Sequence, residues 1–348
     1  MIDGKIEIKN LYKVFGDNPE KAMSLVHDGI SKQDLLDSHG HVLGLRDINI
    51  SIHEKKIKVI MGLSGSGKST LIRHINRLIE PTSGSVMVDG IDVLDMGVEE
   101  LRDFRRHKAS MVFQRFGLLP HRTVAQNVAY GLHIQGVDED ETKARSNRWI
   151  ERVGLSGFEG HFPAQLSGGM QQRVGLARAL ATDAEILLMD EAFSALDPLI
   201  RNDMQNILLD LQRELNKTIV FITHDLDEAL RIGDSIAILR DGEVIQQGDP
   251  QSIIMQPADD YIADFLKDIN RGRVIQVHSV MKKEKTGNGA KIKFNMPLED
   301  ALQEIAQSSK GVSKVVDDEG KIIGSITLAE ALSALTRPDT AANNTKYK

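Results

Sequence analysis

Residues 57–69, IKVIMGLSGSGKS, decide the fold. The first five form a short apolar run that stops at Gly62, which is typical of a buried parallel strand that feeds a loop. Residues 62–69 match the pattern G-x-x-x-x-G-K-[ST] in full, and an amphipathic stretch at about 68–79 predicts the helix that should follow. The strand, loop and helix together predict a phosphate-binding loop in an α/β fold.

The residue types of this loop suit phosphate chemistry. Glycines allow the backbone to curl so that successive N–H groups point inward at phosphate oxygens, and the helix N-terminus adds positive potential. Lys68 is expected to reach the β- and γ-phosphates, and Ser69 to offer its hydroxyl to Mg²⁺. The residues of the loop that we expect to contact the nucleotide are Gly62, Ser64, Gly65, Ser66, Gly67, Lys68, Ser69 and Thr70.

Strands and helices alternate on the C-terminal side of the loop. This alternation implies a mainly parallel sheet covered by helices. The expected strands are 110–114, 186–190, 219–223 and 235–239, and the expected helices lie near 198–215 and 225–231. Residues 123–175 are mainly helical in periodicity, with breaks at Gly136, Gly154 and Pro163.

The N-terminal region has a different pattern. Residues 5–15 alternate in polarity and predict an edge strand, and residues 45–53 alternate again. Residues 17–41 interrupt this pattern, and Asn18-Pro19 can begin a helix, so we expect a short helical insertion there. Residues 84–93 suggest a hairpin.

Two acidic residues end the apolar strand at 186–191, ILLMDE. The carboxyl ends of parallel strands form the ligand crevice of open α/β sheets. Asp190 is therefore expected to organise Mg²⁺, and Glu191 to polarise the attacking water. Taken alone, the pair would also suit a helix cap with a solvent-facing charge. His224 and Gln114 follow other apolar runs, and we expect the first to contact the γ-phosphate and the second a metal-bound water or the nucleophile.

A second anion-binding element lies at residues 166–173, LSGGMQQR, which open a helix that runs to Ala181. Serine at a helix start with two glycines exposes backbone N–H groups to an anion. One chain that carries two separate phosphate-binding elements suggests a composite site shared between two copies.

On these motifs the chain resembles the ATPase subunit of an ATP-binding cassette (ABC) transporter. The resemblance covers about residues 5–250 and implies a P-loop NTPase with a RecA-like core, an antiparallel β subdomain and a helical signature subdomain at about 115–174. It implies ATP and Mg²⁺ as cofactors and a head-to-tail homodimer, with ATP between the phosphate loop of one copy and Ser167, Gly168 and Gly169 of the other. The resemblance assigns catalytic roles to Glu191, His224 and Gln114, and metal binding to Ser69, Asp190 and Gln114. It places Phe15 at the adenine-stacking position. It identifies Ser194–Asp197 as the D-loop, in which Asp197 is expected to contact the nucleotide.

Four features resemble the ATPases of glycine betaine, proline and choline importers more closely: the insertion after Phe15 and residues 76–84, 190–201 and 223–229. This likeness implies uptake of a quaternary amine, with integral-membrane permease subunits and, indirectly, a substrate-binding protein as partners. Nothing in the chain contacts the solute, so an importer for another small solute stays an alternative. Residues 116–120, FGLLP, suit either the seat of a permease helix or ordinary packing of the helical subdomain.

The C-terminal residues form a second, smaller α+β pattern. We expect domains at 1–270 and 271–336 and a disordered tail at 337–348. Residues 315–332 resemble a cystathionine-β-synthase (CBS) motif. Related importers commonly carry two such motifs, and this chain has room for one, so its expected role is regulatory sensing or stabilisation of a dimer. The lysine-rich residues 282–285 suit either anionic lipid or a solvated loop.

Composition limits the remaining classes. The 348 residues include no cysteine, which excludes disulfides and cysteine nucleophiles. The 43 basic and 50 acidic residues give a net charge of −7, so we expect no nucleic-acid partner. No run of 18 apolar residues and no signal peptide is present, so we expect the chain on the cytoplasmic face of the bacterial inner membrane, held there by the permease. A soluble ABC ATPase without a permease, or a regulatory module with a secondary ATPase, is the alternative.

Overall fold

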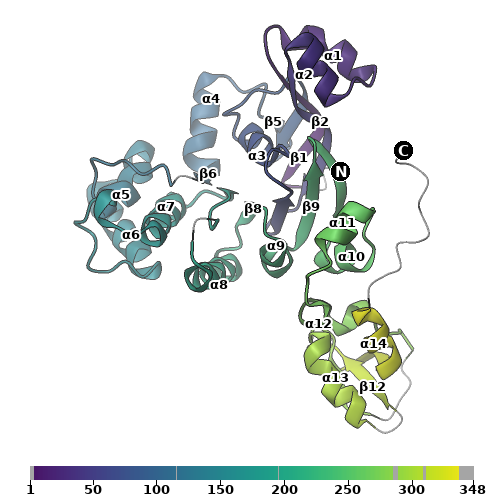
Figure 1. The fold of residues 1–348 in the computed structure, drawn as a ribbon. Helices are drawn as coiled ribbons and strands as arrows, with labels where there is room; N and C mark the ends of the chain where they lie inside the picture. The colour runs from purple at the N-terminus through teal and green to yellow at the C-terminus, as the bar shows by residue number, and fades with distance from the viewer. Residues whose placement is uncertain (1–3, 115, 195, 285–288, 309–310, 337–348) are drawn as a thin grey trace. The chain divides into compact units, whose positions relative to one another are not determined.

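The computed structural model describes residues 4–114, 116–194, 196–284, 289–308 and 311–336 (Figure 1). Contacts divide the chain into a first unit, Met1–Asp225 with Ile232–Ile245, and a second unit, Leu226–Arg231 with Gln246–Lys348. The division that the sequence suggested at 270/271 stays a prediction, and the expected disordered tail lies outside the described residues. No helix in the described part of the chain is long and apolar enough to cross a bilayer.

A six-stranded sheet carries the site, in the strand order β10-β9-β3-β8-β7-β6. β3 pairs in parallel with β8 and β9, and β7 pairs in parallel with β6 and β8, which confirms the predicted parallel sheet. Every residue of β3, β7 and β8 is buried, as apolar strands covered on both faces require. The strands are β3 (Ile57–Met61), β6 (Ala109–Val112), β7 (Ile186–Asp190), β8 (Thr218–Thr223), β9 (Ser235–Arg240) and β10 (Glu243–Gly248).

The second sheet of the first unit is antiparallel, in the order β2-β1-β4-β5. The prediction of an edge strand at residues 5–15 is wrong, because β1 pairs with β2 on one side and with β4 on the other. Alternating polarity reports one solvated face and carries no information on how many neighbours a strand has. The strands are β1 (Ile6–Phe15), β2 (Val42–Ile52), β4 (Ser83–Val88) and β5 (Ile91–Asp92).

The main core lies between the antiparallel sheet and the parallel sheet. It is aliphatic with a single phenylalanine, as the scarcity of aromatic residues predicts. It includes Ile6, Ile48 and Val86 from the antiparallel sheet and Ile60 and Ile222 from the parallel one. The helix that follows the phosphate loop, α3 (Lys68–Ile75), buries Leu71, Ile72 and Ile75 in the same core. The phosphate loop is therefore anchored at both of its ends by buried apolar residues.

The predicted insertion consists of two helices, α1 (Pro19–His27) and α2 (Lys32–His39). They pack on β1 and β2 and bury a small cluster of their own: Val14, Ala22, Met23, Val26, Leu35 and Leu43. The two ends of the insertion lie close together, because Phe15 pairs with Val42 in the sheet. The His41 imidazole also has its two ring nitrogens at 2.6 Å from the backbone oxygens of Asp17 and His39.

Helices α5, α6 and α7 pack on one another and form the helical subdomain (Figure 1). α5 ends at Gly136 in the left-handed region, and α6 is followed by Gly154 in the same region, as the predicted breaks require. Thr123, Asp138 and Ser167 cap the starts of α5, α6 and α7. The bounds are α5 (Val124–Gln135), α6 (Glu139–Arg152), η2 (Pro163–Gln165) and α7 (Gly168–Ala181).

The remaining elements complete both units. In the first unit these are α4 (Val98–Asp103), the π-helical turn η1 (Phe104–Lys108) and α8 (Pro198–Leu215). The second unit has a three-stranded sheet, β11-β12-β13, on which α13 and α14 pack. Its elements are α9 (Leu226–Ile232, whose last residue belongs to the first unit), α10 (Pro250–Met255), α11 (Asp260–Phe265), α12 (Arg271–Val274), η3 (Val277–Ser279), β11 (Lys291–Lys293), α13 (Leu298–Gln307), β12 (Val312–Val316), β13 (Ile322–Thr327) and α14 (Leu328–Leu335).

Candidate functional site

The phosphate loop has a backbone that only glycine tolerates at two of its positions. Gly62 has a φ of 154°, and a Cβ there would lie 2.2 Å from the Leu239 carbonyl oxygen. Gly67, the residue before α3, has a φ of 100°, and a Cβ there would lie 2.8 Å from the Gly44 carbonyl oxygen. Both glycines are therefore required by geometry, and they leave the N-terminus of α3 open to an anion.

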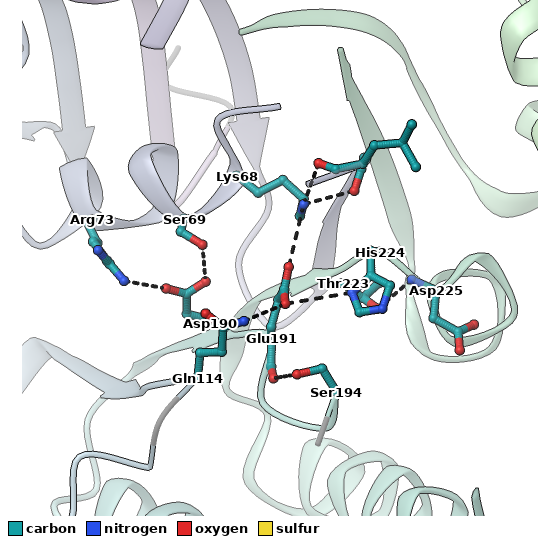
Figure 2. A network of polar contacts seen from close by, with 12 residues as sticks. Lys68, Ser69, Arg73, Gln114, Asp190, Glu191, Ser194, Thr223, His224 and Asp225 are labelled. Atoms are coloured by element: carbon teal, nitrogen blue, oxygen red, sulfur yellow. Dashed lines mark hydrogen bonds and ion pairs between the residues drawn. The ribbon is translucent and has the colours of Figure 1, made fainter. Parts of the chain in front are cut away.

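Lys68 is folded back onto the loop (Figure 2). Its Nζ donates to the carbonyl oxygens of Gly62 and Leu63, each at 2.9 Å, and lies 3.6 Å from Glu191 Oε1. Its side chain is 4% exposed, and burial lowers the pKa of the ammonium while Glu191 partly opposes that shift. A phosphate in the loop would give this buried cation a stronger partner than the two carbonyls.

Asp190 is fully buried at the end of β7, and each of its carboxylate oxygens has a partner (Figure 2). Ser69 Oγ donates to Oδ1 at 2.7 Å, and Arg73 donates to Oδ2 at 3.1 Å. Because the Ser69 hydroxyl proton points at Asp190, the lone pairs of its oxygen are left for a metal ion. The sequence reasoning missed Arg73, although its spacing of four residues from Ser69 on α3 places both on one helix face.

Glu191 is the centre of the polar network (Figure 2). Its Oε2 accepts from Gln114 Nε2 at 2.9 Å and lies 3.7 Å from His224 Nδ1. Its φ is 47°, a left-handed conformation that glutamate rarely adopts, and Ser194 Oγ holds its carbonyl oxygen at 2.9 Å. The structure thus brings together four of the predicted residues, Lys68, Gln114, Glu191 and His224, from four separate loops. Strain of this kind, held by surrounding contacts, is common at functional sites.

Phe15 lies at the end of β1, close to the phosphate loop. Its ring packs on Gly44, where a Cβ would lie 2.7 Å from Phe15 Cε2, and Lys13 Nζ lies 5.0 Å from the ring centroid. The side chain is 39% exposed. The same Gly44 contacts the loop through its carbonyl oxygen, beside Gly67. An exposed aromatic face at this place is suited to stack on a nucleotide base.

The second anion-binding element begins α7, in the helical subdomain, whereas the phosphate loop begins α3 (Figure 1). Ser167 and Gly168 are exposed, and Ser167 Oγ accepts from the N–H of Met170 at 3.3 Å. Asp197 caps α8 by accepting from the N–H of Ile200 at 3.1 Å. The network around Glu191 includes none of Ser167, Gly168, Gly169 and Asp197 among its described contacts. Their described contacts are local caps and helix packing.

The segment after Gln114 is held by two residues that the sequence reasoning missed. Arg178 of α7 donates to the carbonyl oxygens of Phe116 and Gly117, at 2.9 and 2.7 Å. Asn127, fully buried on α5, donates to the carbonyl of Leu119 and accepts from its N–H. These contacts fix the backbone of the segment from the helical subdomain. No sequence signal marks an arginine or an asparagine as a partner of a distant carbonyl.

Residues of this site fit Mg²⁺ with a triphosphate. The donors near the loop are the Ser69 hydroxyl, the Asp190 carboxylate and the Gln114 amide, which are hard oxygen donors of the kind that Mg²⁺ takes besides phosphates and water. Ser66 Oγ is buried in the loop without a hydrogen-bond partner among the described residues. An orphaned hydroxyl in this position is available to a ligand oxygen.

Two cations of the second unit, Lys282 and Arg271, have partners within that unit. Lys282 pairs with Glu330 at 2.7 Å, and Lys285 lies outside the described residues. A cavity of about 610 Å³ is lined by residues that include Asp264, Lys267 and Glu299. Arg271, at its wall, donates to the carbonyls of Ile254 and Ala334 in the last turns of α10 and α14. These bonds are what a cation at helix C-termini makes, so the cavity by itself indicates no ligand.

Known proteins resemble this chain over most of its length. The family model described as ABC transporter matches residues 45–194. The glycine betaine/carnitine transport ATP-binding protein GbuA of Listeria monocytogenes is 49% identical over 326 residues, which cover 94% of this chain and 81% of that protein. The trimethylamine N-oxide transport system ATP-binding protein TmoW of Ruegeria pomeroyi is 43% identical over 332 residues, which cover 95% of this chain and 97% of that protein.

One solved structure resembles the cassette part of this chain. It is the dimeric structure of an ATP-binding cassette in a post-hydrolysis state, bound to ADP and Pi. It superposes with a TM-score of 0.61 at 34% identity and covers 70% of this chain and 98% of that one. The remaining 30% of this chain lies outside the superposed part.

Proposed function

Because the chain belongs to the ATP-binding subunits of ABC transporters, among those of glycine betaine uptake systems, we propose that it hydrolyses ATP to drive the import of a betaine or a related quaternary amine. The candidate solutes are glycine betaine, proline betaine, carnitine and choline. A separate permease would hold the pore, and a binding protein would deliver the solute to it. The chain would lie at the cytoplasmic face of the membrane through its contact with the permease.

One observation carries the catalytic part of this proposal: Glu191 is held in place by Lys68, Gln114 and His224 (Figure 2). A carboxylate beside the phosphate loop can accept a proton from water that attacks the γ-phosphate. In the described state Lys68 and Glu191 face one another at 3.6 Å. When ATP binds, Lys68 would turn to the phosphates and free the carboxylate to orient water. His224 and Gln114 would then hold the γ-phosphate and the water in line.

Ser69 and Asp190 would hold Mg²⁺, with Gln114 beside them. The ion supplies charge neutralisation for the β- and γ-phosphate oxygens when it is bound. Asp190 acts by orienting the Ser69 hydroxyl, which donates to it at 2.7 Å. The backbone N–H groups of the loop and the N-terminus of α3 would bind the remaining phosphate oxygens.

We further propose that two copies of the chain form the complete site. Ser167, Gly168 and Gly169 of one copy would close over ATP held by the loop of the other, with Asp197 of the D-loop nearby. The exposure of Ser167 and Gly168, and their absence from the chain's own network, support this arrangement. Closure of the dimer would be the step that turns the permease, since ATP then serves as the bridge between the copies.

Trimethylamine N-oxide is a second candidate solute. The chain covers 97% of the Ruegeria protein TmoW and 81% of the Listeria protein GbuA, so its length matches the first more closely. Its identity to the second is higher, at 49% against 43%. Trimethylamine N-oxide carries the trimethylated cationic nitrogen that betaines also have, so one pocket chemistry in the binding protein and the permease serves both.

The C-terminal part of the second unit has the order β11, α13, β12, β13, α14 and supports the proposal of one CBS-like motif. In the proposed dimer, the motifs of two copies would pair with one another. We retain stabilisation of the dimer as its proposed role, with regulatory sensing as the alternative. The segment Phe116–Pro120 stays a proposed seat for a permease helix, and packing of the helical subdomain is its alternative.

Uptake in cells that carry the chain together with its neighbouring permease and binding-protein genes tests this function. Radiolabelled glycine betaine should accumulate, and unlabelled carnitine, choline, proline betaine and trimethylamine N-oxide should be compared as competitors. Glu191→Gln in the same cells provides the inactive control. Accumulation of none of these solutes, with the ATPase activity intact, would refute the solute assignment. Strong competition by trimethylamine N-oxide alone would select the second candidate.

A further inference from the structure

Arg201 joins two loops of the first unit that serve different purposes in the proposed function. It lies in the first turn of α8, directly after the D-loop. One arm of its guanidinium pairs with Asp225 Oδ2 at 3.1 Å, and the other donates to the carbonyl oxygen of Leu196 at 3.2 Å. Asp225 follows His224 in the chain, and Leu196 precedes Asp197. The arginine therefore ties the histidine loop to the D-loop through one planar group.

These contacts close a ring around Glu191. His224 lies 3.7 Å from the Glu191 carboxylate, and Ser194 Oγ donates to the Glu191 carbonyl oxygen at 2.9 Å (Figure 2). Asp225 is fixed in turn because its N–H donates to Thr223 Oγ1 at 2.9 Å. The histidine loop thus contacts the Glu191 carboxylate, the D-loop contacts the Glu191 backbone carbonyl, and Arg201 contacts both loops. A shift of His224 toward a γ-phosphate would move Asp225 and, through Arg201, the D-loop.

The D-loop also supports the second anion-binding element. A Cβ on Gly169 would lie 3.2 Å from Ile200 Cγ2 and 3.6 Å from Leu196 Cδ2, so this glycine packs on the start of α8 and on the D-loop. Leu196 is therefore both the residue whose carbonyl Arg201 holds and part of the surface under Gly169. In the proposed dimer, Gly169 faces the nucleotide that the other copy binds.

A purely local cap of the Leu196 carbonyl does not explain this arrangement. Arg201 Nε is buried and has no acceptor among the described residues. A buried donor without a partner is energetically unfavourable. A lysine or a water molecule could satisfy the Leu196 carbonyl alone without leaving such a donor. The planar fork that reaches two loops at once is what an arginine supplies.

We propose that Arg201 is a positioning residue that couples the two nucleotide sites of the dimer. It transmits the position of His224, which senses the chain's own nucleotide, to the D-loop and Gly169, which face the partner's nucleotide. This inference rests on the proposed function, since it needs two ATP sites that share residues. The coupling is carried by contiguous contacts, namely Asp225 to Arg201, Arg201 to Leu196 and Leu196 to Gly169.

The test is the ATP dependence of hydrolysis by the assembled transporter, measured for the wild type, Arg201→Met, Arg201→Lys and Asp225→Asn. Two coupled sites give a Hill coefficient above 1 and at most 2, and independent sites give 1. We expect a value above 1 for the wild type and about 1 for all three variants. Arg201→Lys keeps a cation beside Asp225 but lacks the second arm. Arg213→Met is the matched control, because Arg213 lies on the same helix, is 78% exposed and pairs with Asp210 one turn away.

Each outcome decides the proposal. A wild-type Hill coefficient of about 1, or a wild-type value retained by Arg201→Met or Asp225→Asn, overturns it. If Arg201→Met fails to fold, as thermal unfolding would show, Asp225→Asn removes the same ion pair from the other side and decides alone. The double variant Arg201→Met with Asp225→Asn should lose no more cooperativity than either single variant. Absence of hydrolysis in the wild type would instead refute the proposed function.

Discussion

Lys58→Met is predicted to stabilise the first unit at neutral pH. Lys58 lies on the central strand β3, four residues before the phosphate loop, and its exposed fraction is 4%. No hydrogen bond or ion pair of its ammonium exists among the residues that the structure describes. Burial lowers its pKa from the ordinary 10.5 to about 8. Methionine has a similar length and shape and carries no charge into the same place.

The size of the effect follows from this pKa. A fall from 10.5 to about 8 is about 2.5 units, and at about 1.36 kcal/mol per unit the charged lysine lowers the free energy of unfolding by about 3 kcal/mol. Between pH 8 and 10.5 the unfolded chain binds more protons at this position than the folded chain does. The wild type therefore gains stability as pH rises through this window. The advantage of methionine should be full below pH 8 and lost above pH 10.5.

Urea unfolding followed by tryptophan fluorescence measures the difference. The chain has one tryptophan, Trp149, which is buried in α6 of the first unit and reports on that unit. Both proteins should be unfolded at about pH 7 and about pH 10, so that all other titrations cancel in the comparison. Lys55→Met is the matched control, because Lys55 is 59% exposed. An unchanged or lower midpoint for Lys58→Met at pH 7, or an advantage as large at pH 10 as at pH 7, would refute the reasoning.

Three further predictions concern Glu191, the proposed catalytic carboxylate, and the titratable groups His74 and Glu185. Glu191→Gln should lower hydrolysis by about a hundredfold or more and let an ATP-bound dimer accumulate in size-exclusion chromatography; normal turnover would contradict the role of Glu191. Burial lowers the pKa of His74 to about 4, so the unfolded chain takes up a proton first as pH falls. Relative to His74→Gln, the wild type should lose up to about 3 kcal/mol in urea titrations between pH 6.5 and 4, and parallel acid limbs would argue against this. Hydrogen bonds from Lys108 and then Lys5 lower the pKa of Glu185 to about 2, so its contribution is present above pH 4.5 and lost as pH falls from 4.5 to 2. Glu185→Gln should remove that acid-sensitive part, below about 1 kcal/mol because the side chain is half exposed, and an unchanged acid limb would count against the ion pairs.

The phosphate loop and its flanking elements could be predicted from the sequence because their signals are local. The strand at 57–61, the strand at 186–190 and the helix at 198–215 have the predicted bounds. Each is marked by an unbroken apolar run or by a cap with a proline at the start. The predicted helix at 68–79 is shorter, and α3 ends at Ile75. Beyond that end, Arg77 has a left-handed backbone. Because this position is not a glycine, the sequence gives no sign that the helix stops there.

Pairing and side-chain partners could not be predicted, because they join residues far apart in the chain. β1 lies inside its sheet although its polarity alternates like that of an edge. The strands β10 and β11 escaped prediction because they are polar or only a few residues long. Within the site, residue types identified Lys68, Asp190 and Glu191, whereas Arg73, Arg178 and Arg201 became visible only from their contacts. An arginine that holds a carbonyl has the same sequence context as one in solvent.

The two-helix insertion after β1 has a consequence for protein engineering. Its two ends are held together by the Phe15–Val42 strand pair and by the His41 ring, which contacts the backbone oxygens of Asp17 and His39. Its apolar residues are buried against β1 and β2. A closed loop of this kind adds little entropy penalty to the hairpin that bears it, because the penalty grows only with the logarithm of loop length. Because the ends are adjacent, we expect insertion of a folded domain within this segment to be tolerated, whereas deletion of residues 17–40 would uncover Val14 and Leu43 and remove the Ile30 carbonyl that Arg46 binds. The insertion is thus a site for genetic fusion directly after Phe15, the residue proposed to stack on the base.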